Sequence, residues 1–226
     1  MYIIERMREE DIPEVTQIER ISFSTTWSPQ AYRRELRDNR LARYIVARWV
    51  DDDQDHDEEP VAERGSTPDE SRGVASGIRR AVSQFLSLWR EEEPGRGVPV
   101  RPRLGGYAGL WLMVDEAHIT TIAVRPHLRR RGLGELLMVS MADAAISAGA
   151  DKMTLEVRVS NHEAQSMYRK FGFREEGVRR RYYSDNNEDA VIMWSEPLTS
   201  PEFTKRLAIL RREVQEKMAR SPLPPP

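Results

Sequence analysis

Residues 119–134 read ITTIAVRPHLRRRGLG, and this stretch decides the fold class of the chain. Its β-branched first half predicts a strand that ends at Val124, because Pro126 has no backbone N–H with which to continue the pairing. Gly132 and Gly134 then stand where the next helix is expected to begin. The stretch therefore predicts a strand, a short loop and a helix in succession.

The loop in this unit has the composition of an anion-binding site. Glycines allow a ligand to approach the backbone closely, and the free N–H groups of a first helical turn attract negative charge. Three successive arginines, Arg129, Arg130 and Arg131, add positive charge beside them. The spacing matches neither the dinucleotide fingerprint nor the Lys-Ser/Thr ending of a P-loop. A diphosphate-binding loop is therefore the hypothesis, and a basic helix start with a capping glycine is the plainer alternative.

Hydrophobic periodicity extends this unit into a mixed sheet. Strands are expected over residues 2–7, 43–50, 106–114, 118–124, 153–159, 173–178 and 190–194, and helices over about 9–21, 28–36, 131–149 and 161–170. The strands on either side of the 131–149 helix are expected to be parallel, because a whole helix crosses over between them. The order predicts an α/β (α+β) fold whose mixed, mostly antiparallel sheet is flanked by helices.

Charge is unevenly distributed along the chain. The 226 residues carry 35 Lys and Arg against 37 Asp and Glu, a net of −2. Residues 51–72 hold ten acidic and two basic side chains, a net of −8, which leaves +6 for the rest. So polar a strip cannot bury enough apolar surface to become ordered. Residues 51–103 are therefore expected to interrupt a domain at 1–198, with one amphipathic helix at about 74–92.

The C-terminal segment, residues 199–226, is expected to contain an amphipathic helix followed by a Pro-rich end. Its apolar face, like that of the inserted helix at 74–92, requires a covering surface. Docking on the body of the domain is the preferred interpretation. A protein partner bound through either helix is the alternative.

Composition excludes several classes of protein. The chain has no Cys, which removes disulfide scaffolds, thiolate-ligated metals and thiol nucleophiles. No apolar run approaches the ~20 residues that span a bilayer, and the charged N-terminus does not resemble a signal peptide. No metal is expected, because four histidines share no metal-ligand spacing: His56, His118, His127 and His162. The expectation is a cytoplasmic protein that binds neither membrane nor nucleic acid.

Motifs spread along the chain resemble those of a known family. They are Phe23-x-x-x-Trp27-Ser28, Ile122-Ala123-Val124, Arg130-Arg131-Gly132-Leu133-Gly134, LEVRVSN at 155–161, Met167-Tyr168, Phe171-Gly172-Phe173, RRRYY at 179–183 and EDAVIM at 188–193. In this order they resemble the GCN5-related N-acetyltransferase (GNAT) superfamily, and more closely its ribosomal-protein-alanine N-acetyltransferase (RimI-type) branch. The resemblance covers about residues 1–50 and 104–198.

The resemblance implies a binding site for acetyl-coenzyme A (acetyl-CoA). The donor would lie between two splayed parallel strands at the centre of the sheet, which end at Val124 and Val159. The implied donor contacts come from one strand edge, the arginine-glycine loop and an asparagine: Ile122, Ala123, Val124, Arg129, Arg130, Arg131, Gly132, Leu133, Gly134 and Asn161.

The resemblance also implies roles in the reaction. Glu156 corresponds to the general base, Tyr168 to the general acid, and the Val124 N–H to an oxyanion donor. A groove for a peptide N-terminus would include Trp27, Tyr182 and Tyr183, as a looser expectation.

The chemistry of acetyl transfer requires such groups. An amine attacks a thioester only when it is deprotonated; an α-amine with a pKa of ~8 is about a tenth neutral at pH 7, whereas a Lys with ~10.4 is below roughly a thousandth. One carboxylate therefore suffices for an α-amine, and a phenol near the sulfur can protonate the departing thiolate. Direct transfer needs no acyl-enzyme, which is consistent with a chain that lacks Cys.

Each residue also has a structural interpretation. Glu156 alternates with apolar neighbours, so it could face solvent from its strand. Tyr168 shares a helical stripe with apolar side chains, which is typical of core packing, and paired tyrosines such as Tyr182 and Tyr183 are ordinary hairpin residues. The spacing of Glu156 and Tyr168, one on a strand and one in the next helix, favours a shared cleft.

The sequence therefore predicts an N-terminal protein acetyltransferase, with the N-terminal Ala of a small-subunit ribosomal protein as acceptor. The first alternative is an acetyltransferase that acts on a small-molecule amine or on Lys. The second is a non-catalytic module that keeps this fold and binds a partner. The acidic strip at 51–72 is expected at the tip of a hairpin beside the 129–134 loop, where it would repel coenzyme A phosphates or attract a basic peptide.

Overall fold

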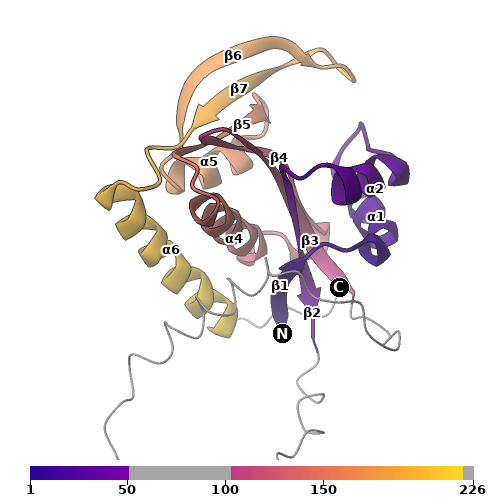
Figure 1. Ribbon diagram of the computed structural model, residues 1–226, viewed down its shortest axis with the longest axis horizontal. Coiled ribbons are helices and arrows are strands. Elements are labelled where there is room, and N and C mark those ends of the chain that lie inside the picture. Colours follow the sequence, from indigo (N-terminus) through magenta and orange to yellow (C-terminus); the bar gives the residue numbers. More distant parts are fainter. Residues whose placement is uncertain (51–102, 221–226) are drawn as a thin grey trace, which may run out of the picture.

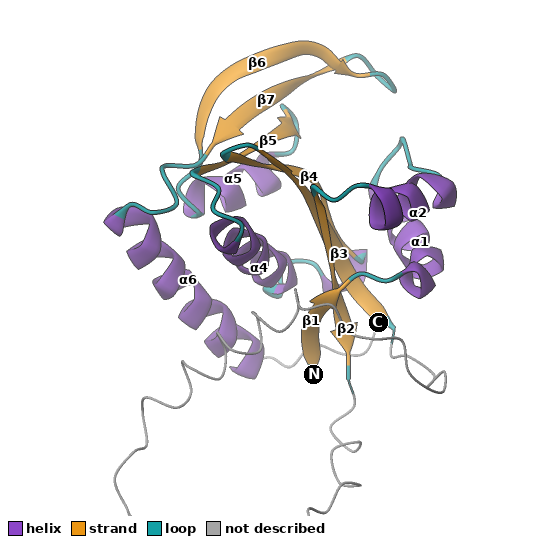
Figure 2. Cartoon of the chain, viewed as in Figure 1, coloured by secondary structure: helices purple, strands orange, loops and turns teal. Residues whose placement is uncertain are grey.

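The computed structural model describes residues 1–50 and 103–220. These ranges form one seven-stranded sheet with helices on both faces (Figure 1, Figure 2). The strands are β1 (Tyr2–Arg6), β2 (Ala42–Trp49), β3 (Leu104–Met113), β4 (Glu116–Val124), β5 (Lys152–Arg158), β6 (Arg174–Tyr183) and β7 (Glu188–Trp194). The helices are α1 (Ile12–Ser22), α2 (Pro29–Asp38), α4 (Leu133–Ser147), α5 (His162–Lys170) and α6 (Pro201–Arg220), with the 3-10 turns η1 (Glu9–Asp11) and η3 (Pro126–Leu128).

The sheet is mixed, as predicted. Its order is β1-β2-β3-β4-β5-β7-β6, and every neighbouring pair is antiparallel except β4 with β5. The parallel pairing covers only Glu116 to Ile119 on β4. On the other edge of β4, Ile119 and Thr121 pair with consecutive residues of β3, so Thr120 between them forms a bulge. Because a bulge bends its strand and increases the twist, β4 leaves β5 beyond this point.

Different helices cover the two faces of the sheet. In Figure 1, α1 and α2 lie on one side, whereas α4, α5 and α6 lie on the other. The core under α4 includes Leu137 and Met141, and the smaller core under α1 and α2 includes Ile18 and Tyr32. The point at which β4 and β5 separate therefore lies between two packed layers.

Local signals explain where two of the helices begin. The Ser28 Oγ accepts a hydrogen bond of 3.2 Å from the Ala31 N–H, and Pro29 occupies the first position of α2. The Asn161 Oδ1 accepts a hydrogen bond of 3.2 Å from the Ala164 N–H at the start of α5. Both caps lie where the sequence predicts that a helix begins, at residues 28 and 161. They matter for the site because each helix begins at the edge of the same opening.

The C-terminal helix α6 docks on the domain, which confirms the preferred interpretation for this segment. Its buried side chains are Phe203, Leu207, Leu210 and Val214. An ion pair joins Arg211 to Asp143 of α4, with 2.7 Å between a guanidinium nitrogen and a carboxylate oxygen. Figure 1 shows α6 beside α4, on the side of the sheet away from α1.

The acidic strip at 51–72 and the predicted helix at 74–92 lie outside the described residues. The hairpin that holds the insertion is present, because β2 and β3 pair antiparallel. Gly106 near the start of β3 pairs with Val124 at the end of β4, so the insertion is attached at the edge where β4 ends. None of the described helices combines the length and hydropathy that a membrane span requires.

Candidate active site

A cleft of about 970 Å³ opens where β4 and β5 separate. Its walls come from both layers, since α1, α4, α5 and α6 all contribute side chains. The predicted site residues that line it are Trp27, Ile122, Ala123, Val124, Arg129, Arg130, Gly132, Gly134, Glu156, Asn161, Tyr168, Tyr182 and Tyr183. Arg131 and Leu133 do not line it: Arg131 is exposed elsewhere, and the Leu133 side chain is fully buried in the core under α4.

The separation of the two strands leaves one edge of β4 without a strand partner. Beyond Ile119 no residue of β4 pairs with β5, and the cleft is lined there by Thr120 to Val124. Backbone N–H and C=O groups that face this gap are available to a ligand, because unpaired groups at a strand edge bind extended molecules by adding hydrogen bonds. This edge is the one to which the resemblance assigned Ile122, Ala123 and Val124.

One end of the cleft is the loop at the start of α4. Gly132 has φ +100°, a left-handed conformation that strains any residue with a Cβ. An added Cβ would also lie 3.3 Å from the Lys217 Cδ. The N–H groups of the first turn of α4 have no partner within the helix, so they are available to bind an anion. We refer to residues 129–135 as the donor loop.

The arginines of the donor loop have different surroundings. The Arg129 Nε donates to the Val124 carbonyl at 3.0 Å, and its guanidinium also reaches the Ser22 Oγ at 3.2 Å. Arg129 therefore holds the loop against the end of β4 and against α1. Arg130 is largely exposed and pairs with Glu163 of α5 at 2.8 Å. Besides Arg129, the positive charges that line this end of the cleft belong to Arg130 and to lysines from other helices.

Two of these lysines meet the donor loop at Glu135. Lys170 of α5 and Lys217 of α6 lie 2.9 and 3.2 Å from its carboxylate oxygens. Burial alone would raise the pKa of Glu135, but hydrogen bonds from the two lysines outweigh burial and lower the pKa. Glu135, Lys170 and Lys217 all line the cleft, so α6 completes the wall of its donor end.

Glu156 lies in the middle of the cleft with its side chain only 6% exposed. The structural alternative, in which Glu156 faces solvent from its strand, is therefore wrong. Its two oxygens lie 3.1 Å from the His118 Nε2 and 3.3 Å from a guanidinium nitrogen of Arg179. The hydrogen bond with His118 lowers the pKa of Glu156, against the effect of burial, and the charge of Arg179 lowers it further. The group is therefore a carboxylate at neutral pH.

Tyr168 lines the same cleft from α5 and is 5% exposed. Its ring packs against Phe173, with 5.9 Å between ring centroids, so the predicted core contact is present. Its hydroxyl makes no hydrogen bond to any residue in the described part of the chain. Burial raises the pKa of this phenol, with a smaller contribution from Tyr183. Tyr168 therefore keeps its proton and has a free O–H to donate.

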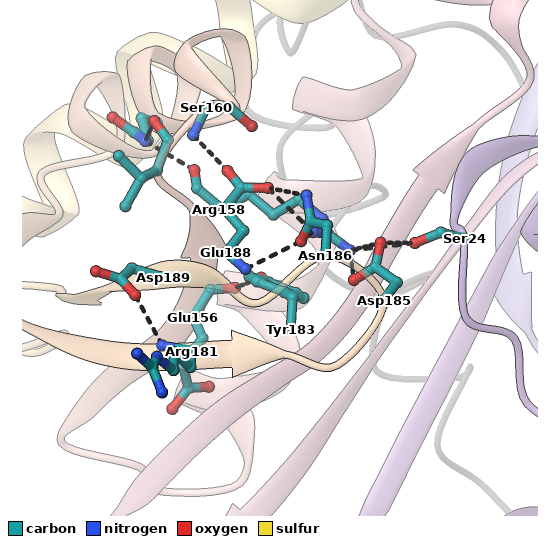
Figure 3. Close-up of polar contacts among 12 residues, drawn as sticks. Ser24, Glu156, Arg158, Ser160, Arg181, Tyr183, Asp185, Asn186, Glu188 and Asp189 are labelled. Atoms are coloured by element: carbon teal, nitrogen blue, oxygen red, sulfur yellow. Dashed lines mark hydrogen bonds and ion pairs between the residues drawn. The ribbon is translucent and has the colours of Figure 1, made fainter.

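The other end of the cleft lies under the hairpin of β6 and β7, which arches over the sheet in Figure 1. Figure 3 shows how Arg158 fixes the turn of this hairpin. Its guanidinium lies 2.8 Å from Asp185 and 3.0 Å from Glu188, and it also donates to the Ser24 Oγ at 3.2 Å. Asp185 accepts a hydrogen bond from Ser24 as well. The hairpin turn is thereby tied to the segment between α1 and α2.

Aromatic side chains line this end. Tyr183 lies under Arg158, with 3.8 Å from the guanidinium carbon to the ring centroid, and Tyr182 meets Tyr183 edge-on at 5.2 Å. Trp27 is 37% exposed and lies beside Tyr32, with 5.6 Å between the ring centroids. The structure thus brings Trp27, Tyr182 and Tyr183 to one cleft. We refer to this end, with its aromatic and acidic side chains, as the acceptor end.

Sequence reasoning missed four residues that shape the cleft: Glu19, His118, Arg158 and Lys217. The sequence separation of His118 and Glu156 does not predict their contact, because the contact depends on the register of β4 and β5. Lys217 lies in a segment that the resemblance does not cover. Arg158 stood inside a quoted motif, but its partners come from the hairpin turn and the loop after α1.

Within residues 1–50 and 103–220, no three His, Cys, Asp or Glu side chains are grouped as a metal site would require. The polar groups that line the cleft there are carboxylates, phenols, hydroxyls and cations, together with free backbone N–H groups. Such a set can bind an anionic ligand at one end and an amine at the other, with proton-transferring groups between them.

Comparison with known proteins gives a family and several relatives. Residues 12–173 match the family described as acetyltransferase (GNAT). A Bacillus subtilis (strain 168) protein, provisionally named a ribosomal protein bS18-alanine N-acetyltransferase, is 34% identical over 191 residues, 84% of this chain and 93% of the relative. The enzyme of that name from Salmonella typhimurium is 40% identical over 93 residues, which cover 40% of this chain and 63% of the relative.

A solved structure shows the same fold. The crystal structure of the ribosomal-protein-S18-alanine N-acetyltransferase from Escherichia coli superposes with a TM-score of 0.58 at 23% identity. The superposition covers 88% of this chain and 96% of that one.

Proposed function

This chain belongs to the acetyltransferase (GNAT) family, and from that premise we propose that it acetylates the N-terminal α-amine of a protein with acetyl-CoA as donor. One observation carries the proposal. A single cleft joins an anion-binding helix start to a buried carboxylate and a free phenol, Glu156 and Tyr168. These are the groups that bind a diphosphate, accept a proton and donate one.

The residues at the donor end fit acetyl-CoA. The free N–H groups of the donor loop, with Arg130 and Lys217, would hold its phosphates, and the open edge of β4 from Ile122 to Val124 would pair with its amide-containing arm. When bound, acetyl-CoA supplies a thioester carbonyl as the electrophile. Asn161 caps α5 at the rim of the cleft and would contact the same arm.

Proton transfer in the proposed reaction uses Glu156 and Tyr168. The amine nitrogen forms a bond to the acetyl carbon and loses a proton to the Glu156 carboxylate, directly or through a water. The carbon–sulfur bond breaks, and Tyr168 donates its hydroxyl proton to the sulfur. Glu156 then returns a proton to the Tyr168 phenolate. The Val124 N–H would stabilise the carbonyl oxygen as it gains negative charge.

Two observations support a protein N-terminus as the acceptor. The acceptor end is bordered by the β6–β7 hairpin and its aromatic side chains, which suit a peptide backbone entering under the hairpin. The Bacillus subtilis and Salmonella typhimurium relatives are named for the N-terminal alanine of ribosomal protein bS18. We therefore propose a ribosomal protein with an N-terminal Ala as the acceptor, and the cytoplasm as the place of reaction.

A substrate panel tests this proposal. The purified full chain is incubated with labelled acetyl-CoA and peptides that differ only in their first residue, each with one internal Lys. Transfer to the α-amine, fastest for the peptide that begins with Ala, is the expected result. A polyamine and an N-terminally blocked, Lys-containing peptide form the other arms. Faster acetylation of either would replace the protein N-terminus with a small-molecule or Lys acceptor, and no transfer would leave only a binding module.

A further inference from the structure

One carboxylate at the acceptor end has no role in the reaction described above. Glu19 belongs to α1 and lines the cleft, although the residue is only 3% exposed. Its Oε1 accepts a hydrogen bond of 3.1 Å from the Trp27 N–H. Its Oε2 is buried and has no hydrogen-bond partner. The structure therefore contains a buried carboxylate oxygen at the cleft that no group of the described chain satisfies.

No cation in the described ranges compensates the charge of Glu19. Arg129 on the neighbouring loop contacts Ser22 and Val124 instead, and Glu156 has its own pairs with His118 and Arg179. A buried carboxylate without a cation is unfavourable, so this position favours either a proton or a positively charged ligand. Burial raises the pKa of Glu19, while the hydrogen bond from the Trp27 N–H and the nearby Tyr32 hydroxyl oppose the rise.

The surroundings of Glu19 suit an ammonium group. The rings of Trp27, Tyr32 and Tyr44 line the same cleft, and aromatic faces attract cations. The Tyr32 hydroxyl donates to the Tyr107 hydroxyl at 3.0 Å, and the Thr121 Oγ1 donates to the same oxygen at 3.3 Å. These groups are neutral, so they leave the negative charge of Glu19 uncompensated for a ligand.

We propose that Glu19 binds the N-terminal ammonium of the acceptor and takes the first of its two protons. The inference rests on the proposed acetyl transfer to a protein α-amine and assigns the step before attack. An ammonium at pH 7 must lose one proton to gain a lone pair and a second as the amide forms. Glu19 takes the first, and Glu156 takes the second. Since Tyr168 supplies one proton to the sulfur and recovers it from Glu156, one proton per turnover passes from Glu19 to water.

The contrast between the two carboxylates supports this division. Glu156 is paired with a histidine and an arginine, which lower its pKa and leave it a weak base. Glu19 has no such pair, and its raised pKa makes it the stronger proton acceptor of the two. The titratable groups that face Glu19 are Tyr32 of α2 and Tyr107 of β3; burial raises the pKa of both phenols, so neither is charged near neutral pH.

Glu19→Gln tests the inference, because the amide oxygen preserves the acceptor for the Trp27 N–H while the charge is lost. The measured quantity is kcat/KM for an Ala-initiated peptide between about pH 6.5 and 9.5, a range that spans the α-amine pKa of ~8. We expect a loss of at least about tenfold near pH 7, and a smaller loss above pH ~8, where the free amine predominates. Glu14→Gln is the matched control, since Glu14 lies on the same helix outside the cleft lining.

Three outcomes would overturn the inference. A folded Glu19→Gln protein with the wild-type profile would show that the charge is not used. An equal loss at every pH would indicate a structural role for Glu19. If wild type acetylates no peptide α-amine, both the proposed function and this inference are wrong. If wild type acetylates the α-amine and Glu19→Gln does so equally well, only this inference is wrong.

A second measurement needs no variant of the chain. The affinity of wild type for the Ala-initiated peptide is compared with that for the same peptide carrying a propionyl group in place of the alanine, which lacks only the amine. Binding at least about tenfold weaker for the amine-free peptide is expected, because the peptide then leaves the Glu19 carboxylate unpaired. Equal affinity would contradict an ammonium site.

Discussion

The two ends of the cleft are built in different ways. The donor end is built around one continuous segment, residues 129–135, where the backbone N–H groups of the first turn of α4 are available to a ligand. The acceptor end and the centre are assembled from side chains of distant elements, among them Glu19, Glu156 and Tyr168. A site made of backbone groups depends on the conformation of the loop and tolerates most changes of side chain. A site made of side chains is sensitive to the substitution of each functional group. This contrast predicts which substitutions reduce activity or binding at each end.

The largest effect is expected from Tyr168→Phe. This change keeps the ring against Phe173 and removes only the hydroxyl, which makes no other hydrogen bond in the described chain. We expect kcat to fall by about 10²–10⁴, the range typical of a lost general acid. Steady-state kinetics measure kcat, and calorimetric titration with acetyl-CoA provides the control, since its Kd should stay at the wild-type value. An unchanged kcat would remove the proton-donor assignment.

Glu156→Gln is expected to lower kcat by about 10², because the amide cannot accept the proton. The substitution also leaves His118 and Arg179 without their carboxylate, so the melting temperature must be measured beside activity. Arg174→Gln is an exposed control on β6, outside the cleft lining. A folded Glu156→Gln protein that retains full transfer would contradict the base assignment.

At the donor end, the largest effect should come from the backbone. Gly132→Ala places a Cβ at φ +100° and 3.3 Å from the Lys217 Cδ. The left-handed conformation costs an L residue about 1–2 kcal/mol, so either stability falls by that amount or the loop changes shape. We expect acetyl-CoA to bind about tenfold more weakly, as calorimetry would measure. Wild-type affinity at wild-type stability would show that the loop is not a backbone site.

His118→Ala tests the pairing at the centre of the cleft. His118 is the main cause of the lowered pKa of Glu156, so its loss should raise that pKa toward the ordinary value. A carboxyl whose pKa is lowered in the folded protein stabilises the fold at pH values above its pKa in the unfolded chain, ~4.3 for Glu. This stabilisation is lost as the pH falls through the pKa of the folded protein. As the pH is lowered, the variant should therefore lose activity and stability at a higher pH than wild type. The pH profile of kcat and acid unfolding monitored by fluorescence measure this, and identical acid limbs would contradict the pairing.

The smallest effect is expected from Lys217→Ala. Its charge is partly neutralised by Glu135, and the backbone N–H groups of the donor loop remain. The Kd for acetyl-CoA should rise about two- to threefold, with a weaker dependence on salt, because one exposed charge contributes little. Arg212→Ala, an exposed cation on the same helix outside the cleft lining, should leave the Kd unchanged. A hundredfold loss would mean that the donor end depends on side chains after all.

The same contrast explains what the sequence could predict. The donor loop is local, so its glycines and arginines in 119–134 were sufficient to locate it. Strand β6 extends beyond the predicted 178 to Tyr183, because Arg179 and Tyr183 still pair with β7 on either side of a shift in register. The partners of Glu156 depend on strand register, and the position of Glu19 depends on how α1 docks on the sheet. The hydrophobic periodicity of a single sequence predicts neither the register nor the docking.

In the proposed function, this cleft moves an acetyl group from acetyl-CoA to a protein α-amine. Mass spectrometry can locate the acetyl group on a peptide that begins with Ala and contains one internal Lys. We expect acetylation of the α-amine by wild type and its near loss in Tyr168→Phe. Acetylation of the Lys, or equal α-amine acetylation by both proteins, would rule out the proposed reaction.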